Sequence, residues 1–104
     1  MTDDFRFSNM ADVRNANREL GHHFFDRDTM RFFDSKIVGA LIGGRYFITS
    51  ERFNAESPRL YTIRKAQPNG DVGTVGAFQQ YRTREAAYAE AKAMAKGQNL
   101  DVTA

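Results

Sequence analysis

Residues 36–53 read KIVGALIGGRYFITSERF, and this stretch decides the fold. Lys36 to Ile42 is rich in β-branched and apolar residues, which is typical of a strand. Gly43 and Gly44 can supply the positive φ angles of a tight hairpin turn. Arg45 to Phe53 then alternates between apolar and polar residues, as a half-buried strand does. The stretch therefore predicts two antiparallel strands joined by a short turn.

A second hairpin is predicted directly after the first one. Arg59 to Ala66 alternates as a third strand, and Val72 to Phe78 returns as a fourth. Between them, Pro68-Asn69-Gly70-Asp71 is the strongest turn signal in the chain, because Asn-Gly favours the tight turns of hairpins. Since short turns join all four strands, we expect an antiparallel meander sheet.

Two amphipathic helices are predicted on either side of these strands. Apolar residues recur at helical spacing over residues 9–20, and Gly21 stands where a glycine often ends a helix. The second helix covers residues 84–96, which are rich in alanine, and Thr83 is a suitable N-cap. We expect both helices to pack on one face of the sheet, which gives a two-layer α+β fold.

The segment between the first helix and the strands holds four of the nine phenylalanines, in two adjacent pairs. A helical turn over residues 29–33 and a short strand are both compatible with it. Adjacent phenylalanines cannot both point into the core from one regular element, so we expect one of each pair at an edge. Arginine and aromatic residues together are typical of protein contact surfaces. The candidate binding residues are Phe24, Phe25, Arg27, Arg31 and Phe33.

The composition bounds the class of protein. A chain of 104 residues with 41% hydrophobic residues is expected to fold as a single domain over 1–104, with frayed ends at 1–7 and 98–104. The lack of cysteine excludes disulfides and thiolate metal sites and favours a reducing compartment. We expect no signal peptide, because the sequence opens with two acids and no apolar stretch follows them, and no apolar run reaches the length of a membrane helix. We therefore expect a cytoplasmic protein without membrane contact.

The motifs of common enzymes are missing from the chain. His22 and His23 are adjacent, so only one of them could join Asp26 or Asp28 around a metal ion. The glycines of residues 39–44 lack the Lys-Ser/Thr ending of a phosphate-binding loop, and no nucleophile elbow is present. We expect no catalytic residue, no metal and no cofactor. A small metal-dependent enzyme centred on His22, His23 and Asp26 is the third-ranked alternative.

Binding of single-stranded nucleic acid is the second-ranked alternative. The net charge of +2 is close to balance and does not by itself indicate a nucleic-acid partner. Aromatic residues on a sheet with arginines around them can nevertheless stack bases. The residues of this alternative surface are Arg45, Tyr46, Arg52 and Arg64.

A hairpin over residues 59–78 leads through Tyr81 into Thr83-Arg84-Glu85-Ala86-Ala87 at the head of a helix. This pattern resembles small uncharacterised domains of bacteria and their phages, and residues 25–33 are similar to a run in short phage-associated proteins. The resemblance implies a bacterial or phage source and a family without an assigned activity. With the absence of enzyme motifs, it favours a non-enzymatic protein-interaction or accessory module. Its protein partner is unknown, and an edge strand could also support a weak homodimer.

Overall fold

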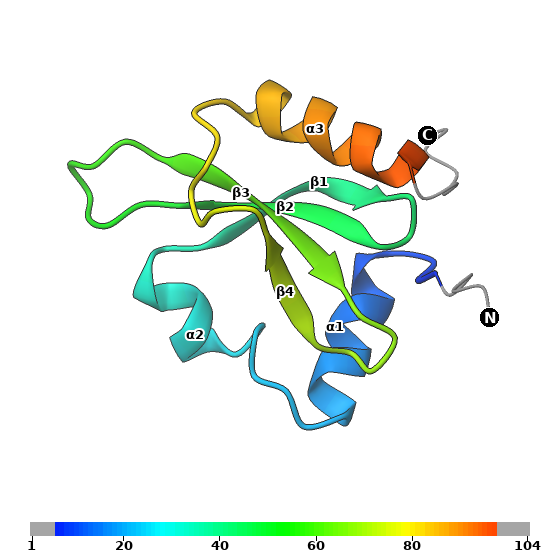
Figure 1. The fold of residues 1–104 in the computed structure, drawn as a ribbon. Helices are drawn as coiled ribbons and strands as arrows, with labels where there is room; N and C mark the ends of the chain where they lie inside the picture. Colours follow the sequence, from blue (N-terminus) through cyan, green and yellow to red (C-terminus); the bar gives the residue numbers. More distant parts are fainter. Residues whose placement is uncertain (1–5, 98–104) are drawn as a thin grey trace.

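The structure, a computed structural model, describes residues 6–97 (Figure 1). Most of the ends that were expected to fray, 1–7 and 98–104, lie outside these residues. Phe7 lies inside them, and its backbone N–H donates a hydrogen bond to the carbonyl of Gly44 at 2.9 Å. Its side chain packs against the core, so this part of the N-terminal segment is held against the first hairpin turn.

Four antiparallel strands form one sheet in chain order, as the sequence predicts. They are β1 (Lys36–Ile42), β2 (Tyr46–Glu51), β3 (Leu60–Ala66) and β4 (Val72–Val75). The hairpin glycines Gly43, Gly44 and Gly70 have the positive φ angles that the turns require. β4 ends at Val75 and not at Phe78, because Gly76, with a φ of +76°, turns the chain out of the sheet.

Three helices accompany the sheet: α1 (Met10–Glu19), α2 (Arg27–Phe32) and α3 (Arg84–Gly97). The Asn9 side chain accepts the backbone N–H of Asp12 at 2.9 Å and caps α1. The Thr83 hydroxyl caps α3 in the same way, at 3.1 Å from the backbone nitrogen of Ala86. The segment that could have been helix or strand contains the short helix α2. Between residues 6 and 97, none of the helices has the length and apolarity that crossing a bilayer requires.

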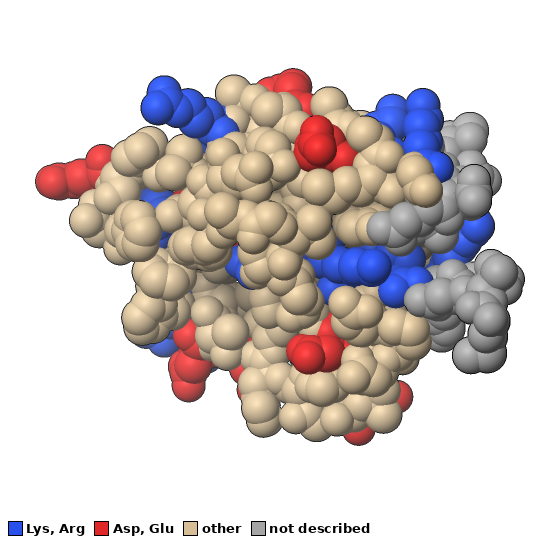
Figure 2. Space-filling view, viewed as in Figure 1, with Lys and Arg blue, Asp and Glu red and all other residues tan. Residues whose placement is uncertain are grey.

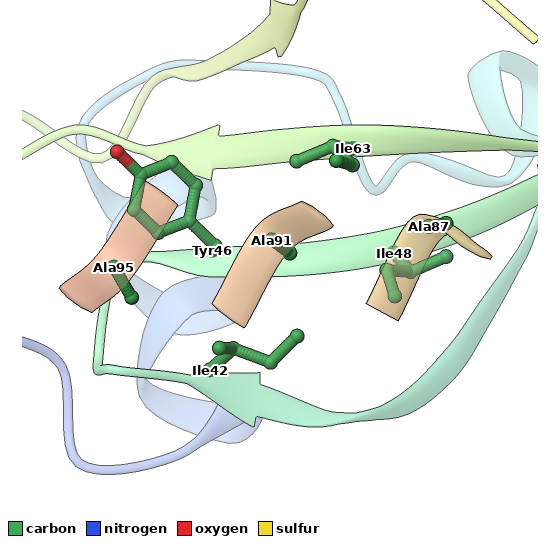
Figure 3. Packing of buried hydrophobic residues seen from close by; sticks show 7 residues of the cluster. All are labelled: Ile42, Tyr46, Ile48, Ile63, Ala87, Ala91 and Ala95. Carbon is green, nitrogen blue, oxygen red and sulfur yellow. The ribbon is translucent and has the colours of Figure 1, made fainter. Parts of the chain in front are cut away.

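The helices α1 and α3 lie on opposite faces of the sheet, which corrects the prediction that both pack on one face. α3 covers one face through three alanines, which meet the isoleucines of β2 and β3 (Figure 3). α1 covers the other face, where Val13 packs with Phe47 and Ala66. The fold therefore has three layers, with the sheet in the middle (Figure 1).

The cause of this arrangement lies in β2, which is buried along its whole length and not on one face alone. Tyr46 and Ile48 point toward α3, while Phe47 points toward α1. Since both faces of β2 carry large apolar side chains, each face needs a cover of its own.

The β3–β4 turn is fixed directly onto α1. The buried side chain of Asn17 donates a hydrogen bond to the carbonyl of Gly70 at 2.7 Å and accepts one from the backbone N–H of Phe24 at 3.2 Å. A Cβ atom at Gly70 would lie 2.7 Å from the carbonyl oxygen of Ala16. The glycine thus allows the turn and the helix to meet backbone to backbone.

Candidate interaction surface

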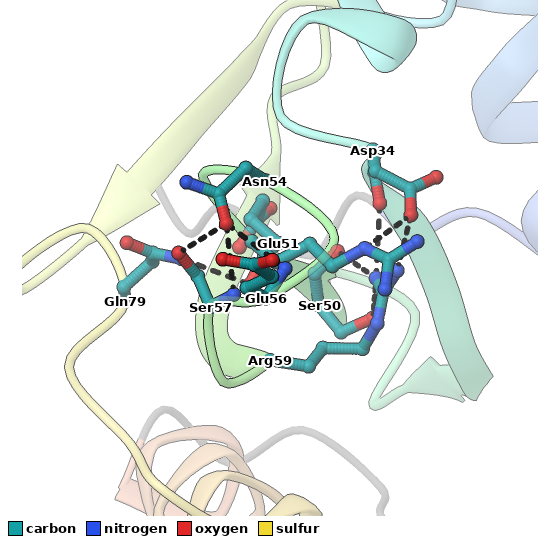
Figure 4. Close-up of polar contacts among 9 residues, drawn as sticks. Asp34, Ser50, Glu51, Asn54, Glu56, Ser57, Arg59 and Gln79 are labelled. Carbon is teal, nitrogen blue, oxygen red and sulfur yellow. Dashed lines mark hydrogen bonds and ion pairs between the residues drawn. The ribbon is translucent and has the colours of Figure 1, made fainter.

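A buried carboxylate lies at the end of β2, on the face away from α3. Glu51 accepts hydrogen bonds from Thr62 at 2.8 Å on Oε1, and from Thr49 and Arg64 on Oε2, the latter at 2.9 Å. Gln79 donates its side-chain N–H to the backbone carbonyl of Glu51 at 2.8 Å (Figure 4). Since the Glu51 side chain is fully buried and both its oxygens are occupied, this carboxylate holds Arg64 in place.

Arg64 links this buried network to a group of aromatic side chains. Its Nε donates to the Thr49 hydroxyl at 3.0 Å and its Nη1 to the Thr74 hydroxyl. Its Cζ lies 5.2 Å from the ring centroid of Phe24 and 5.6 Å from that of Phe78. A guanidinium can stack on aromatic rings while all its edges donate, which a lysine ammonium cannot do. Arg64 therefore fixes the place of both rings.

Phe33 stands at the centre of a cluster of rings on the surface. Its ring centroid lies 4.5 Å from that of Phe32, 5.4 Å from that of Phe53 and 5.3 Å from that of Phe78. The three neighbours come from α2, from the loop after β2 and from the loop after β4. They are 75%, 62% and 40% exposed, respectively. We call these four residues the aromatic surface.

A hollow of about 480 Å³ opens beside the aromatic surface, between α2 and the sheet. Phe24 and Met30 form its apolar wall, and Arg64 lies among its lining residues. Contiguous exposed apolar residues around a depression are typical of sites that bind other molecules.

Two residues with left-handed backbone conformation support the aromatic surface. Asp34 follows Phe33 directly and has a φ of +47°, and Gln79 follows Phe78 directly and has a φ of +58°. Among the described residues, these are the non-glycine positions with positive φ. Such a conformation costs free energy and persists only where the surroundings enforce it. The backbone is thus held in unfavourable conformations next to the two rings that meet at the centre of the surface.

Asp34 is the centre of a clamp of two arginines (Figure 4). Its Oδ2 accepts from Arg52 Nε at 2.8 Å and from Arg59 Nη2 at 2.6 Å, and Arg59 also reaches Ser50 Oγ at 2.8 Å. Desolvation acts to raise the pKa of Asp34. The hydrogen bond from Arg52 and the charges of Arg52, Arg59 and Lys36 outweigh it, so the pKa lies below its ordinary value of 3.8.

Of the five predicted binding residues, Phe33 lies on the aromatic surface. Phe24 and Phe25 are half-buried, and their ring centroids lie 6.1 Å and 5.9 Å from that of Phe47. Both rings pack against the core below α1, and neither of them is the exposed ring that was expected in this pair. Arg27 and Arg31 are exposed on α2. In the second pair, Phe32 is the exposed member, as the expectation of one ring at an edge requires.

The four residues of the alternative nucleic-acid surface do not lie together. Arg45 and Tyr46 are buried, and Arg45 donates its Nε to the carbonyl of Ala66 at 3.0 Å. Arg64 lies on the other face of the sheet from Tyr46 and pairs with Glu51, whereas Arg52 pairs with Asp34. On the face shown in Figure 2, charged residues of both signs are scattered among uncharged ones. The exposed surface that these four residues would have formed is therefore not present.

The two histidines have separate partners. His22 Nε2 lies 3.1 Å from the carbonyl oxygen of Asn69, and His22 Nδ1 lies 3.8 Å from Asp71. His23 Nδ1 lies 2.8 Å from Asp26 Oδ2. Within residues 6–97, no group of three or more histidines, cysteines or acids is arranged to hold a metal ion.

These elements define a small α+β protein with a central antiparallel meander between two layers of helices. The model of the Family of unknown function (DUF7447) matches residues 9–92, from the N-cap of α1 into α3, and the chain belongs to this family. No curated protein and no solved structure shows a significant match to this chain. The prediction of a family without an assigned function is thereby confirmed.

Proposed function

We propose that this chain is a non-enzymatic binding module that docks a protein partner on the aromatic surface. The observation that carries the proposal is the convergence of exposed Phe32, Phe53 and Phe78 around Phe33. Burial of a phenylalanine side chain stabilises a protein by roughly 1.5–3 kcal/mol. Three such side chains that stay 40% to 75% exposed at one place forgo part of this gain, unless a partner covers them.

The charges near the aromatic surface favour a protein partner over a nucleic acid. Arg52 and Arg59 share the carboxylate of Asp34, and Arg64 is paired with Glu51. On α2, Arg27 and Arg31 stand with Asp28, and Asp26 precedes the helix directly. Binding to a phosphate backbone needs a surplus of cations that can release counterions. The aromatic surface lacks such a surplus, while its rings suit the apolar anchors of a protein interface.

The lack of catalysis, the location and the source are further parts of the proposal, and each has its own support. The carboxylate of Glu51 supports a role without catalysis, because it is fully buried and both its oxygens accept hydrogen bonds from Thr49, Thr62 or Arg64. The absence of cysteine supports a reducing location such as the cytoplasm. The resemblance to phage-associated domains supports a bacterial or phage source.

The test compares three forms of the protein as bait in lysate of the source cells. The first is the wild type and the second is the double variant Phe32→Ser/Phe53→Ser, which alters two exposed rings. The third is Leu20→Ser, a matched control, because Leu20 is 58% exposed at the C-cap of α1 and is not among the residues that line the hollow beside the aromatic surface. Captured proteins are identified, purified and titrated against each form. We expect a partner that binds the wild type and Leu20→Ser equally and the double variant at least tenfold more weakly.

A purified partner that binds the double variant as tightly as the wild type would overturn the proposal. The nucleic-acid alternative is addressed by adding single-stranded oligonucleotide at low and at high salt and recording proton–nitrogen NMR spectra. Chemical-shift changes at residues of the aromatic surface that become smaller at high salt would indicate that this surface binds a nucleic acid and not a protein.

A further inference from the structure

The chain contains a single Asn-Gly pair, Asn69-Gly70, in the turn between β3 and β4. In such a pair the backbone nitrogen of the glycine can attack the side-chain carbonyl carbon of the asparagine, because no Cβ on the glycine hinders the approach. The new nitrogen–carbon bond closes a succinimide ring, and the side-chain nitrogen leaves as ammonia. Water then opens the ring and leaves aspartate or isoaspartate at position 69. Water is the only co-reactant, and it reaches the turn because Asn69 is exposed.

The folded structure restrains the nitrogen that would carry out this attack. The backbone N–H of Gly70 donates to the carbonyl of Gln67 at 2.9 Å, and Gly70 is buried although Asn69 beside it is exposed. The side-chain Oδ1 of Asn69 accepts the backbone N–H of Asp71 at 3.0 Å. The attack requires that the Gly70 nitrogen gives up its proton and that the Asn69 side chain turns toward it. The turn must therefore open before the ring can close.

The helix α1 and the segment after it hold this turn closed (Figure 1). The buried Nδ2 of Asn17 donates to the carbonyl of Gly70 at 2.7 Å, and His22 Nε2 lies 3.1 Å from the carbonyl oxygen of Asn69. A Cβ atom at Gly70 would lie 3.2 Å from the backbone nitrogen of Asn17. Since helix and turn touch backbone to backbone, the turn can change its shape only when α1 moves away.

We propose that Asn69 is a site of spontaneous deamidation that the docking of α1 keeps closed, and that the isoaspartate product keeps α1 from docking again. Isoaspartate carries the main chain through its side-chain carbons, which adds a methylene group to the backbone at position 69. The Gly70 carbonyl is then displaced from the buried Asn17 amide, which loses its partner. The modified chain thus records that α1 was once released. This inference is independent of the proposed function, because the turn is not part of the aromatic surface.

Peptide mapping by mass spectrometry measures the rate of deamidation at Asn69 while the full chain is incubated. The folded wild type should react at least about tenfold more slowly than the chain unfolded in urea, because the turn must first open. Val13→Ala weakens the packing of α1 on Phe47 without touching the turn and should accelerate the reaction. The control Ala91→Leu overpacks α3 on the other face of the sheet and should leave the rate near that of the wild type.

Two results would overturn the control of this site by α1. One is a folded wild type that reacts as fast as the unfolded chain. The other is an equal acceleration in Val13→Ala and Ala91→Leu, which would mean that the reaction follows unfolding of the whole domain and not release of α1. Circular dichroism shows whether each variant is folded. Met10→Ala, at a partly buried position of α1, takes the place of Val13→Ala if that variant does not fold.

The effect of the product is tested on the modified protein itself. Deamidated protein carries an additional negative charge, so ion exchange separates it, and peptide mapping distinguishes its isoaspartate form. Amide hydrogen exchange in α1 should be at least about tenfold faster in this form than in the wild type. Asn69→Asp is the matched control, because it adds the same charge without the methylene group, and it should keep wild-type exchange. Equal exchange in the isoaspartate form and in Asn69→Asp would contradict the proposal.

Discussion

Glu51 on β2 and Arg64 on β3 form an ion pair of 2.9 Å whose carboxylate is completely removed from water. The two threonines that complete the site, Thr49 and Thr62, face each other across the same pair of strands. A buried pair of this kind adds little net stability, because desolvation offsets the attraction, but removal of one member leaves a buried charge unpaired.

We therefore expect Arg64→Met to lower the free energy of unfolding by about 3–5 kcal/mol. The double variant Glu51→Leu/Arg64→Met removes both charges and should regain most of this loss. Urea denaturation followed by circular dichroism measures all three proteins. Equal instability of the single and the double variant would show that the stacking of Arg64 on Phe24 and Phe78 matters more than the charge balance.

The Asp34 clamp should make stability depend on pH in acid. The folded state holds the pKa of Asp34 below its ordinary value of 3.8. The stabilising contribution is therefore fully present above that value and is lost as pH falls through the lower pKa of the folded state. Unfolding curves from pH 6 down to pH 2 should show this loss in the wild type. Asp34→Asn, which tolerates the left-handed backbone, should lack that component, and a parallel pH profile in both proteins would contradict the prediction.

Gly70 and Gly21 provide a matched pair of glycine substitutions. Both have positive φ angles, +84° and +86°. A Cβ at Gly21 meets no atom within 4 Å, whereas one at Gly70 lies 2.7 Å from the Ala16 carbonyl oxygen. Gly21→Ala should cost about 1–2 kcal/mol from the backbone conformation alone. Gly70→Ala should cost clearly more, since α1 must also move, and thermal unfolding of the two variants measures the difference.

The alanines of α3 set how closely this helix approaches the sheet. Ala91 is fully buried above the isoleucines of β2 and β3, whereas Ala93 is exposed (Figure 3). Ala91→Leu should lower stability by about 1–3 kcal/mol through overpacking. Ala93→Leu adds the same side chain in water and should change stability by no more than about 0.5 kcal/mol. A tolerated Ala91→Leu would mean that α3 can move away from the sheet at little cost.

Local sequence patterns were sufficient to predict the four strands, α1 and α3, but they left the segment of α2 undecided between a helical turn and a strand. β1 has the bounds that its composition predicts, and the turns lie at Gly43-Gly44 and Asn69-Gly70. Turn chemistry and periodicity act over a few residues, so they can be read from the chain directly.

The order of the layers could not be predicted in this way. Alternation places Tyr46 and Phe47 on different faces of β2, but it does not say which helix covers which face. The decisive contact joins Val13 to Phe47, which are far apart in the chain. Because both helices have an apolar side, either assignment agrees with their periodicity.

The aromatic surface was only partly predictable for a related reason. Phe32 and Phe33 lie in a visibly unusual segment, and Phe33 was among the candidate residues. Phe53 and Phe78 come from loops at the ends of different strands. Each looks like an ordinary strand residue in the sequence, and their convergence depends on the sheet register and on the left-handed residues Asp34 and Gln79.

The meander order of the strands also determines how the protein can fold during synthesis. Each strand pairs with the one made just before it, so loop closure is short and the sheet can form hairpin by hairpin. The face around Ile48 and Ile63 is different, because its cover, α3, is synthesised only after all four strands. A nascent chain that has completed its sheet therefore presents a bare apolar face until the ribosome has released α3, and at that stage it is most exposed to aggregation and to chaperones.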